Sequence, residues 1–260
     1  MTPLKNAMNA QLYFHKHAAQ VTVIGKEGQE RLRNARVHIA GFGGLGNMTA
    51  FFLAMSGVGY ISANDRQRLE TDNLNRFACG SEADLGTPKV VAAARNFASA
   101  RPDLAFEPIV AATEEDCSDL AVEQSDWIVC ASNTISSRLA CAERALRYGK
   151  PLLDIAVTDG RYSLAGIIKY WLPECPWSAC PACYLDREVS VERNEGLLTS
   201  VISVTAAMAA HLLVLFLSGT APSTLREKNL SFIQLNQSLQ IETMAVEQRS
   251  SCTVCGGVNR

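Results

Sequence analysis

Four glycines in one short stretch can bind a phosphate group. The segment Gly-Phe-Gly-Gly-Leu-Gly places them at Gly41, Gly43, Gly44 and Gly46. Glycine adopts positive φ angles and lets the backbone approach an anion closely, and a helix that follows offers free N–H groups and the positive end of its dipole. Such a turn also occurs where a strand simply packs against a helix, so the glycines alone leave both interpretations open.

An acidic residue follows the glycines at a distance that suits a ribose. Asp65 comes directly after the short apolar run from Tyr60 to Ala63 and Asn64, which we expect to form the second strand. A carboxylate at that strand end, about 20 residues beyond the glycines, can accept hydrogen bonds from a pair of ribose hydroxyls. A nicotinamide-dependent dehydrogenase would show the same two features.

Two Cys-x-x-Cys pairs are the second chemical signal, Cys180 with Cys183 and Cys252 with Cys255. Each pair can bind a metal ion from one tight turn, and four thiolates form the tetrahedral shell of a structural Zn²⁺ with no open position. Redox-active dithiols are the alternative. The other five cysteines follow no pattern and indicate free thiols in a reducing cytosol; they are Cys79, Cys117, Cys130, Cys141 and Cys175.

Several segments together resemble the family of ubiquitin-activating enzymes. The glycine loop and Asp65 are followed by Asn-Leu-Asn-Arg at 73–76 and by Gly-Thr-Pro-Lys at 86–89. In this order and at these separations, they look like the bacterial adenylyltransferases of the MoeB, ThiF and HesA types, over nearly all of the chain. The resemblance implies attack of a C-terminal carboxylate on the α-phosphate of MgATP, giving an acyl-adenylate and pyrophosphate. A dehydrogenase has no use for the last two segments.

The resemblance also implies roles for single residues. It assigns the glycine loop to the phosphates, Asp65 to the ribose, and Asn73, Arg76 and Lys89 to the triphosphate. The transition state accumulates negative charge on the α-phosphate and on the leaving pyrophosphate, so fixed cations there lower the barrier. In isolation Arg76 and Lys89 would be interpreted as surface cations, but their position beside these motifs favours the phosphate role. The resemblance further implies that the four paired cysteines hold zinc and attach the C-terminus.

One position departs from the family pattern. The turn after the fourth strand reads Thr-Asp-Asn in the family and its Asp holds Mg²⁺, whereas an ungapped match from Asp126 to Arg138 places Asn133 there. An amide brings no charge, and Mg²⁺ prefers carboxylate, water and phosphate oxygens. Three interpretations follow: Asp154, at the end of the next strand, supplies the carboxylate; ATP holds most of the metal; or the chain binds nucleotide without turning it over.

Two further departures concern the N-terminus and a loop. In the family, an arginine near the N-terminus reaches the partner subunit's ATP site, and this chain has no counterpart to it. His15 or Lys16 would substitute for that arginine, or else the N-terminal segment that carries them is a solvated helix face. Thioester-forming relatives place a nucleophilic cysteine in the loop before the apolar helix. Residues 187–194 contain none, and Cys175 is better interpreted as a packing thiol. We therefore expect adenylation without a thioester on this chain.

Alternating strands and helices must position these groups. Strands are expected over 37–40, 60–63, 105–110, 127–130 and 151–155, and helices over 47–55 and 89–100, with an amphipathic lead-in over 8–23. This predicts a Rossmann-like, mostly parallel sheet with helices on both faces. Period-two alternation over 156–172 and a hairpin over 231–235 and 239–244 predict an antiparallel C-terminal part that carries the zinc site. We expect a single domain over 1–260, with a nucleotide-binding half at 1–155 and an acceptor-binding and zinc half at 156–260.

Bulk composition agrees with this fold class. The chain has 260 residues, 48% of them hydrophobic, which suits one α/β domain. Its net charge of −2 shows no excess of basic residues of the kind that binds nucleic acid. The apolar run 197–217 is interrupted by hydroxyl groups and His211, so a core or interface helix is favoured over a membrane span. The N-terminus has no secretory apolar region, so we expect a cytoplasmic protein with no membrane partner.

These observations predict a homodimeric adenylyltransferase that uses ATP and Mg²⁺ and contains structural Zn²⁺. Its acceptor is either a ubiquitin-like sulfur carrier ending in Gly-Gly or a ribosomal precursor peptide of a natural product. The departures from the family pattern favour a specialised pathway. The alternative function is a non-catalytic nucleotide-binding scaffold or partner subunit with the same fold, which Asn133 supports and the intact Arg76 and Lys89 oppose.

Overall fold

A computed structural model describes residues 11–158, 164–175, 177–185, 197–235 and 239–255. Within these ranges, eight strands form one sheet in the order β3-β2-β1-β4-β5-β6-β7-β8. The strands are β1 (Arg36–Ala40), β2 (Tyr60–Asn64), β3 (Ala105–Ile109), β4 (Trp127–Cys130), β5 (Leu152–Val157), β6 (Ala165–Trp171), β7 (Leu230–Gln234) and β8 (Gln240–Met244). The helices are α2 (Ala18–Asn34), α3 (Gly44–Met55), α4 (Lys89–Ala100), α5 (Asp119–Glu123), α6 (Ile135–Tyr148) and α7 (Thr199–Ser218). Short 3-10 helices are η1 (Thr71–Arg76), η2 (Glu82–Asp84), η3 (Asp116–Ser118), η4 (Pro181–Cys183) and η5 (Ser223–Arg226).

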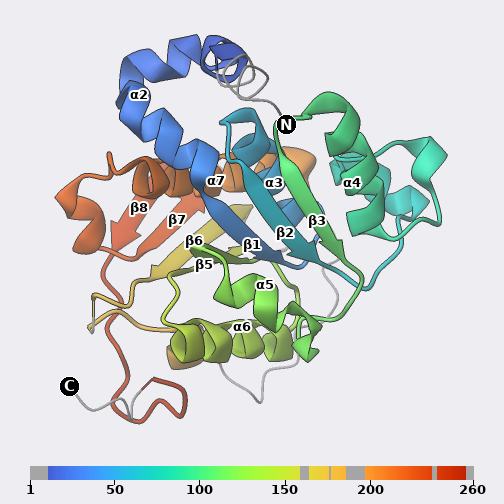
Figure 1. The fold of residues 1–260 in the computed structure, drawn as a ribbon. Coiled ribbons are helices and arrows are strands. Elements are labelled where there is room, and N and C mark those ends of the chain that lie inside the picture. The colour runs from blue at the N-terminus through green and yellow to red at the C-terminus, as the bar shows by residue number, and fades with distance from the viewer. Residues whose placement is uncertain (1–10, 159–163, 176, 186–196, 236–238, 256–260) are drawn as a thin grey trace.

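The sheet has a parallel half and an antiparallel half. Strands β1 to β5 pair in parallel, and β6, β7 and β8 continue the sheet antiparallel. Helices α2, α3 and α7 cover one face, whereas α5 and α6 cover the other (Figure 1). Residues of β1, β2 and β4 are almost all buried, as expected for strands covered on both faces. This confirms the predicted Rossmann-like sheet with an antiparallel C-terminal part.

The strand register brings the loops of the site together. Ala40 pairs with Asn64 on one side and with Cys130 on the other, and Cys130 pairs in turn with Asp154. The carboxyl ends of β1, β2 and β4 are therefore close to level, and β5 continues past them from Asp154 to Val157. The strand order reverses between β1 and β4, which is the place where open α/β sheets bind ligands.

The apolar helix α7 is a core element. It packs against α2 and α3 and against strands β5 and β6, and Ala206, Ala209 and Leu213 are fully buried. Gly219, with a φ of 76°, ends the helix in the left-handed conformation that suits glycine. Although its length and composition would allow it to cross a membrane, its packing agrees with the predicted core helix.

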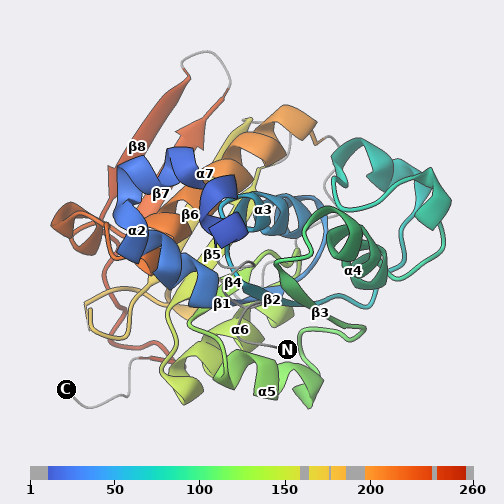
Figure 2. The same ribbon diagram turned by 45° about the horizontal axis from the view of Figure 1, so that its top comes forward.

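Several predicted element boundaries differ from the structure, most of them by one residue. Ala156 and Val157 belong to β5, because they continue its antiparallel pairing with β6, which begins only at Ala165. The N-terminal helical segment covers 11–16 and continues through α2, with a kink at Gly25. The predicted hairpin is confirmed as β7 and β8, which extend away from the helical layer (Figure 2).

Candidate functional site

The glycine loop joins β1 to α3 at the carboxyl edge of the sheet. Gly41 has a φ of 87°, which residues with side chains rarely adopt. A Cβ on Gly41 would also lie 3.0 Å from backbone atoms of Ala131 and Ser132, so the loop fits closely against the turn after β4. Gly43 faces open space. Because α3 begins directly after it, the first N–H groups of a helix can receive an anion there.

Asp65 lies beside this loop. Its Oδ2 accepts a hydrogen bond from the backbone N–H of Phe42 at 2.8 Å, and its Oδ1 accepts one from the N–H of Gln67 at 2.7 Å. The structure thus brings the predicted ribose-binding carboxylate into direct contact with the predicted phosphate loop.

The helical turn η1 places Asn73 and Arg76 next to the start of α3. The side chain of Asn47 holds this turn in place. The Asn47 amide nitrogen donates to the Arg76 carbonyl at 2.9 Å, and Asn47 Oδ1 accepts from the N–H of Ala78 at 2.8 Å. The Cδ of Arg76 lies 3.3 Å from the position that a Cβ on Gly44 would occupy. The sequence analysis did not single out Asn47. The available signal was an amide residue at the start of an otherwise apolar helix, where its side chain can bind a neighbouring backbone segment.

The side chains of Asn73 and Arg76 are bound locally in this structure. The Arg76 guanidinium donates to Asn75 Oδ1 at 2.9 Å and pairs with Asp72 at 3.5 Å, while its side chain stays 23% exposed. Asn73 accepts from the N–H of Glu70 at 3.3 Å and donates to Asp72 at 2.9 Å. To bind phosphate, each would exchange some of these contacts for phosphate oxygens.

Lys89 is the first residue of α4 and is only 6% exposed. Its ammonium donates to Gln67 Oε1 at 2.8 Å. Burial lowers the pKa of Lys89, and the nearby Asp65 carboxylate opposes this shift. A buried cation whose partner is a neutral amide is well suited to an anion, because a charge-assisted hydrogen bond would offset its desolvation.

The turn between β4 and α6 carries Asn133. The Asn133 side chain is exposed, and within the described ranges it makes no hydrogen bond. Its neighbour Ser132 is buried, 3.3 Å from the hydroxyl of Thr113. Thr134 caps α6, because its Oγ1 accepts from the N–H of Ser137 at 3.2 Å. The amide of Asn133 is therefore available to a ligand at the edge where the glycine loop lies, and its contact with Mg²⁺ stays a prediction.

Asp154 has protein partners on both carboxylate oxygens. One oxygen forms an ion pair with Arg138, and the other accepts from the hydroxyl of Tyr184 at 2.6 Å. The Asp154 side chain is 7% exposed. The predicted role of Asp154 as a metal ligand would require the exchange of one of these partners.

A polar network that the sequence did not reveal lies beneath the site. His38 in β1 is buried, with its ring nitrogens 2.9 Å from Ser62 Oγ and 3.1 Å from Asn64 Oδ1. Burial lowers the pKa of His38 to about 4, so the ring is neutral at pH 7. Asn64 donates to Thr113 Oγ1 at 3.2 Å, and Thr113 contacts Ser132. Polar residues inside the two apolar strands were the available signal.

The four paired cysteines form one buried cluster. Their Sγ atoms all lie within 4.8 Å of one another, with Cys180 3.8 Å from Cys252 and Cys183 3.4 Å from Cys255. Tetrahedral Zn²⁺ with bonds of about 2.3 Å places neighbouring sulfurs about 3.8 Å apart, so the cluster fits zinc. Burial raises the pKa of Cys180 and raises that of Cys255 to about 11, whereas hydrogen bonds from the backbone of Cys255 and Val254 and from neighbouring thiols lower the pKa of Cys252 to about 7 against the effect of burial.

Other predicted positions have no contact with this site. Lys16 forms an ion pair with Asp103 of its own chain at 3.0 Å, and His15 is exposed. Cys175 is buried and burial raises its pKa, which agrees with a packing thiol. The loop 187–194 lies outside the described residues.

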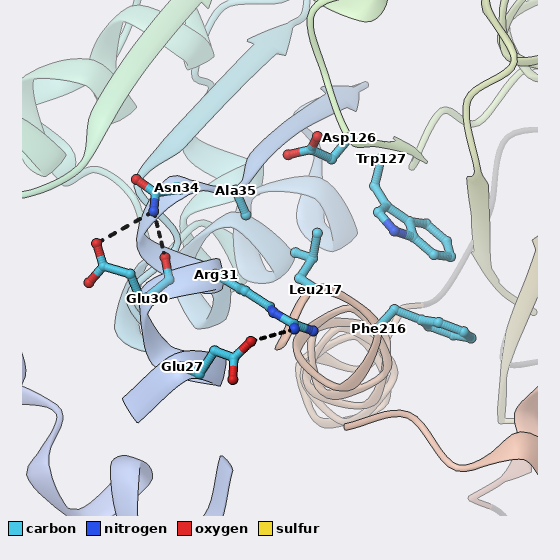
Figure 3. A pocket seen from close by; sticks show the side chains of 9 residues that line it. All are labelled: Glu27, Glu30, Arg31, Asn34, Ala35, Asp126, Trp127, Phe216 and Leu217. Carbon is cyan, nitrogen blue, oxygen red and sulfur yellow. Dashed lines mark hydrogen bonds and ion pairs between the residues drawn. The ribbon is translucent and has the colours of Figure 1, made fainter. Parts of the chain in front are cut away.

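A cavity of about 540 Å³ opens at the opposite end of the sheet. It lies between the end of α2, the start of β4 and the end of α7 (Figure 3). Arg31 is paired with Glu27 there at 2.7 Å. The lining residues include none of the predicted site residues and are Glu27, Glu30, Arg31, Asn34, Ala35, Asp126, Trp127, Phe216 and Leu217.

Comparison with known proteins agrees with the motifs. Residues 15–254 match the model of the ThiF family. The vegetative HesA protein of Trichormus variabilis is 25% identical over 252 residues, which cover 96% of this chain and 92% of that protein. The sulfur carrier protein ThiS adenylyltransferase of Escherichia coli is 25% identical over 254 residues, which cover 95% of this chain and 96% of that protein.

Solved structures share the fold. E. coli MccB crystallised with ATP has a TM-score of 0.78 at 19% identity, over 98% of this chain and 82% of the MccB chain. PaaA has a TM-score of 0.75 at 20% identity, over 91% of this chain and 74% of its own. Because the family match spans nearly the whole chain, this protein belongs to the ThiF family of the E1-like adenylyltransferases.

Proposed function

We propose that this protein is an ATP-dependent adenylyltransferase that converts a carboxylate of a small carrier protein or precursor peptide to an acyl-adenylate. One observation carries the proposal. The glycine loop, Asp65, Arg76 and Lys89 come from separate segments and meet at the carboxyl edge of the sheet, where the strand order reverses. An anion-binding loop, a carboxylate and two cations at one edge are the groups that a nucleoside triphosphate requires.

Each of these groups has a separate role in the proposed reaction. The loop N–H groups and the start of α3 hold the phosphates, and Asp65 accepts hydrogen bonds from the ribose. A carboxylate oxygen of the acceptor attacks the α-phosphorus, the bond to the bridging oxygen breaks, and pyrophosphate leaves. Arg76 and Lys89 stabilise the charge that develops on both groups. Asn133 would lie near Mg²⁺, which would supply positive charge for the phosphate oxygens.

Two acceptor classes are supported by different relatives. The E. coli relative is named for the sulfur carrier protein ThiS, and MccB, which shares the fold, was crystallised with MccA. The amide at position 133 and the altered N-terminal segment favour a specialised peptide pathway over housekeeping sulfur transfer. The family resemblance also leads us to propose a cytoplasmic homodimer.

Exchange of labelled pyrophosphate into ATP tests the enzyme. The exchange is measured with Mg²⁺ against a panel of carrier proteins ending in Gly-Gly and short peptides, with Arg76→Ala as the inactive control. We expect exchange to depend on one acceptor and to be lost in the variant. ATP binding without exchange for any acceptor would contradict the proposal.

Asn133 favours a second candidate, a nucleotide-binding scaffold that has lost turnover. A scaffold would bind ATP without exchange, and Asn133→Asp would restore exchange by returning a carboxylate to the metal position. Exchange by the unchanged protein would exclude this candidate.

A further inference from the structure

The contacts of Asp154 connect the cysteine cluster to the turn that carries Asn133. Tyr184 directly follows the zinc-binding residue Cys183, and its hydroxyl donates to Asp154 Oδ2 at 2.6 Å. The other oxygen of Asp154 is paired with Arg138, and the two side chains of this pair are only 7% and 12% exposed. One buried carboxylate thus joins the zinc-binding turn to α6.

The Tyr184 ring is held in this position from the sheet. Lys169 is the cross-strand partner of Asp154 between β5 and β6, and its ammonium lies 2.8 Å from the centre of the Tyr184 ring. A buried carboxylate that loses one donor is costly, because water cannot replace that donor. The position of Tyr184 therefore affects how firmly Asp154 holds Arg138.

From Arg138 the contacts reach the glycine loop. Its guanidinium donates to the carbonyl of Ile155 at 3.0 Å, and its backbone N–H donates to the carbonyl of Thr134 at 3.2 Å. These bonds fasten the first turn of α6 to β5. The backbone of Ala131 and Ser132, in the turn just before α6, packs against Gly41, 3.0 Å from the position that a Cβ on Gly41 would occupy. A shift at the start of α6 would move this backbone.

We propose that Tyr184 is a positioning residue that couples zinc occupancy of the cysteine cluster to ATP binding at the glycine loop. Zinc would fix the turn η4 and with it the Tyr184 hydroxyl, and Asp154 and Arg138 would hold the start of α6 against the loop. In this proposal Asp154 positions Arg138, which is an alternative to its predicted contact with Mg²⁺. The inference rests on the proposed nucleotide site and assigns zinc no part in the chemistry.

Reciprocity makes the coupling measurable from both sites. If zinc tightens ATP binding, ATP must tighten zinc binding by the same factor, and such factors are typically about 5 to 150. The zinc dissociation constant of the full chain is measured by competition with a zinc-selective chelator, with and without ATP in excess Mg²⁺. ATP affinity of the zinc-loaded protein is measured by calorimetry. We expect ATP to lower the zinc dissociation constant about 5-fold or more.

Two matched variants locate the route. Tyr184→Phe removes only the hydroxyl and leaves the ring and the zinc ligands. Tyr148→Phe removes a similar bond at the other end of α6, where the Tyr148 hydroxyl donates to Asp119 at 3.1 Å. In Tyr184→Phe, we expect ATP to change the zinc dissociation constant by a factor of only about one. In Tyr148→Phe, we expect ATP to lower the zinc dissociation constant as it does in the unchanged protein. If ATP merely stabilised the whole fold, all three proteins would show equal coupling.

The possible results separate this inference from the proposed function. Equal coupling in Tyr184→Phe and in the unchanged protein overturns the inference and leaves the adenylyltransferase proposal intact. A lack of ATP binding by the unchanged protein overturns both. Amide hydrogen exchange over residues 131–138 is an independent measurement on zinc-loaded protein: Tyr184→Phe should exchange faster there, and unchanged exchange would contradict the connection.

Discussion

The carboxylate of Asp65 lies 2.8 Å from the backbone nitrogen of Phe42, so the residue expected to bind ribose also holds the glycine loop. Its second oxygen accepts from the N–H of Gln67. An ionised carboxylate has about four acceptor sites, so both bonds leave capacity for ribose hydroxyls. One side chain therefore holds the glycine loop and is the predicted ribose ligand.

Replacing this carboxylate should weaken ATP binding. Asp65→Asn removes a charged acceptor, and hydrogen bonds to charged groups contribute about 1.5–3 kcal/mol, so the ATP dissociation constant should rise about 10-fold or more. Calorimetry with ATP measures the loss of affinity. Calorimetry with 2′-deoxyATP measures how far the variant has lost its preference for the nucleotide that carries the 2′-hydroxyl. Asp126→Asn is the matched control, because Asp126 accepts from the backbone N–H of Arg36 at the opposite sheet edge. Equal losses in both variants would argue against a ribose contact.

Lys89 should act mainly on the rate. Lys89→Ala removes a buried cation expected to face the developing phosphate charge, so pyrophosphate exchange should fall about 10²- to 10³-fold. Exchange rates at saturating ATP measure this effect. Arg95→Ala, an exposed cation on the same helix, should leave the rate nearly unchanged. A Lys89→Ala rate equal to that of the control would rule out the phosphate role.

A carboxylate at position 133 should change the metal requirement. Asn133→Asp adds charge at an exposed side chain, so ATP binding should reach half its maximum at a lower Mg²⁺ concentration, whereas Asn133→Ala should need a higher one. Calorimetric titrations at several Mg²⁺ concentrations provide the measurement. If all three proteins share one Mg²⁺ dependence, residue 133 does not face the metal.

Zinc should stabilise the fold through the cysteine cluster. Cys180→Ser removes one of the four buried cysteines that are predicted to bind zinc, and loss of a structural metal is among the changes that cost more than about 4 kcal/mol. Zinc content and denaturant unfolding measure the two effects. Cys117→Ser is the control, since Cys117 is exposed and outside the cluster. Stoichiometric zinc in Cys180→Ser would contradict the predicted ligand set.

Acid should destabilise the fold through His38. Between pH 6.5 and about 4 the unfolded chain binds a proton at this residue and the native state does not, so stability falls as pH falls through this window. The shift corresponds to about 3 kcal/mol at the acid end. Urea unfolding across this range should show a shallower pH dependence in His38→Asn. His15→Asn, at an exposed histidine, should keep the full dependence.

Local features were predictable from the sequence alone. The strand β4 and the start of α4 at Lys89 match the predicted bounds, because buried runs between turn signals specify such elements locally. The glycine loop was recognisable because the positive φ of Gly41 restricts the residue type. The two cysteine pairs were recognisable because each needs only one turn to present two ligands.

The partners of these groups were decided only by the tertiary structure. Tyr184 and Asp154 are 30 residues apart and Cys180 and Cys252 are 72 apart, and each pair meets only because the antiparallel half of the sheet returns the chain to β5. Local patterns specify which element a residue belongs to. The direction and partner of its side chain depend on sheet register and on packing between distant segments. For this reason the sequence could offer Asp154 as one candidate for the metal carboxylate but could not reveal its ion pair with Arg138.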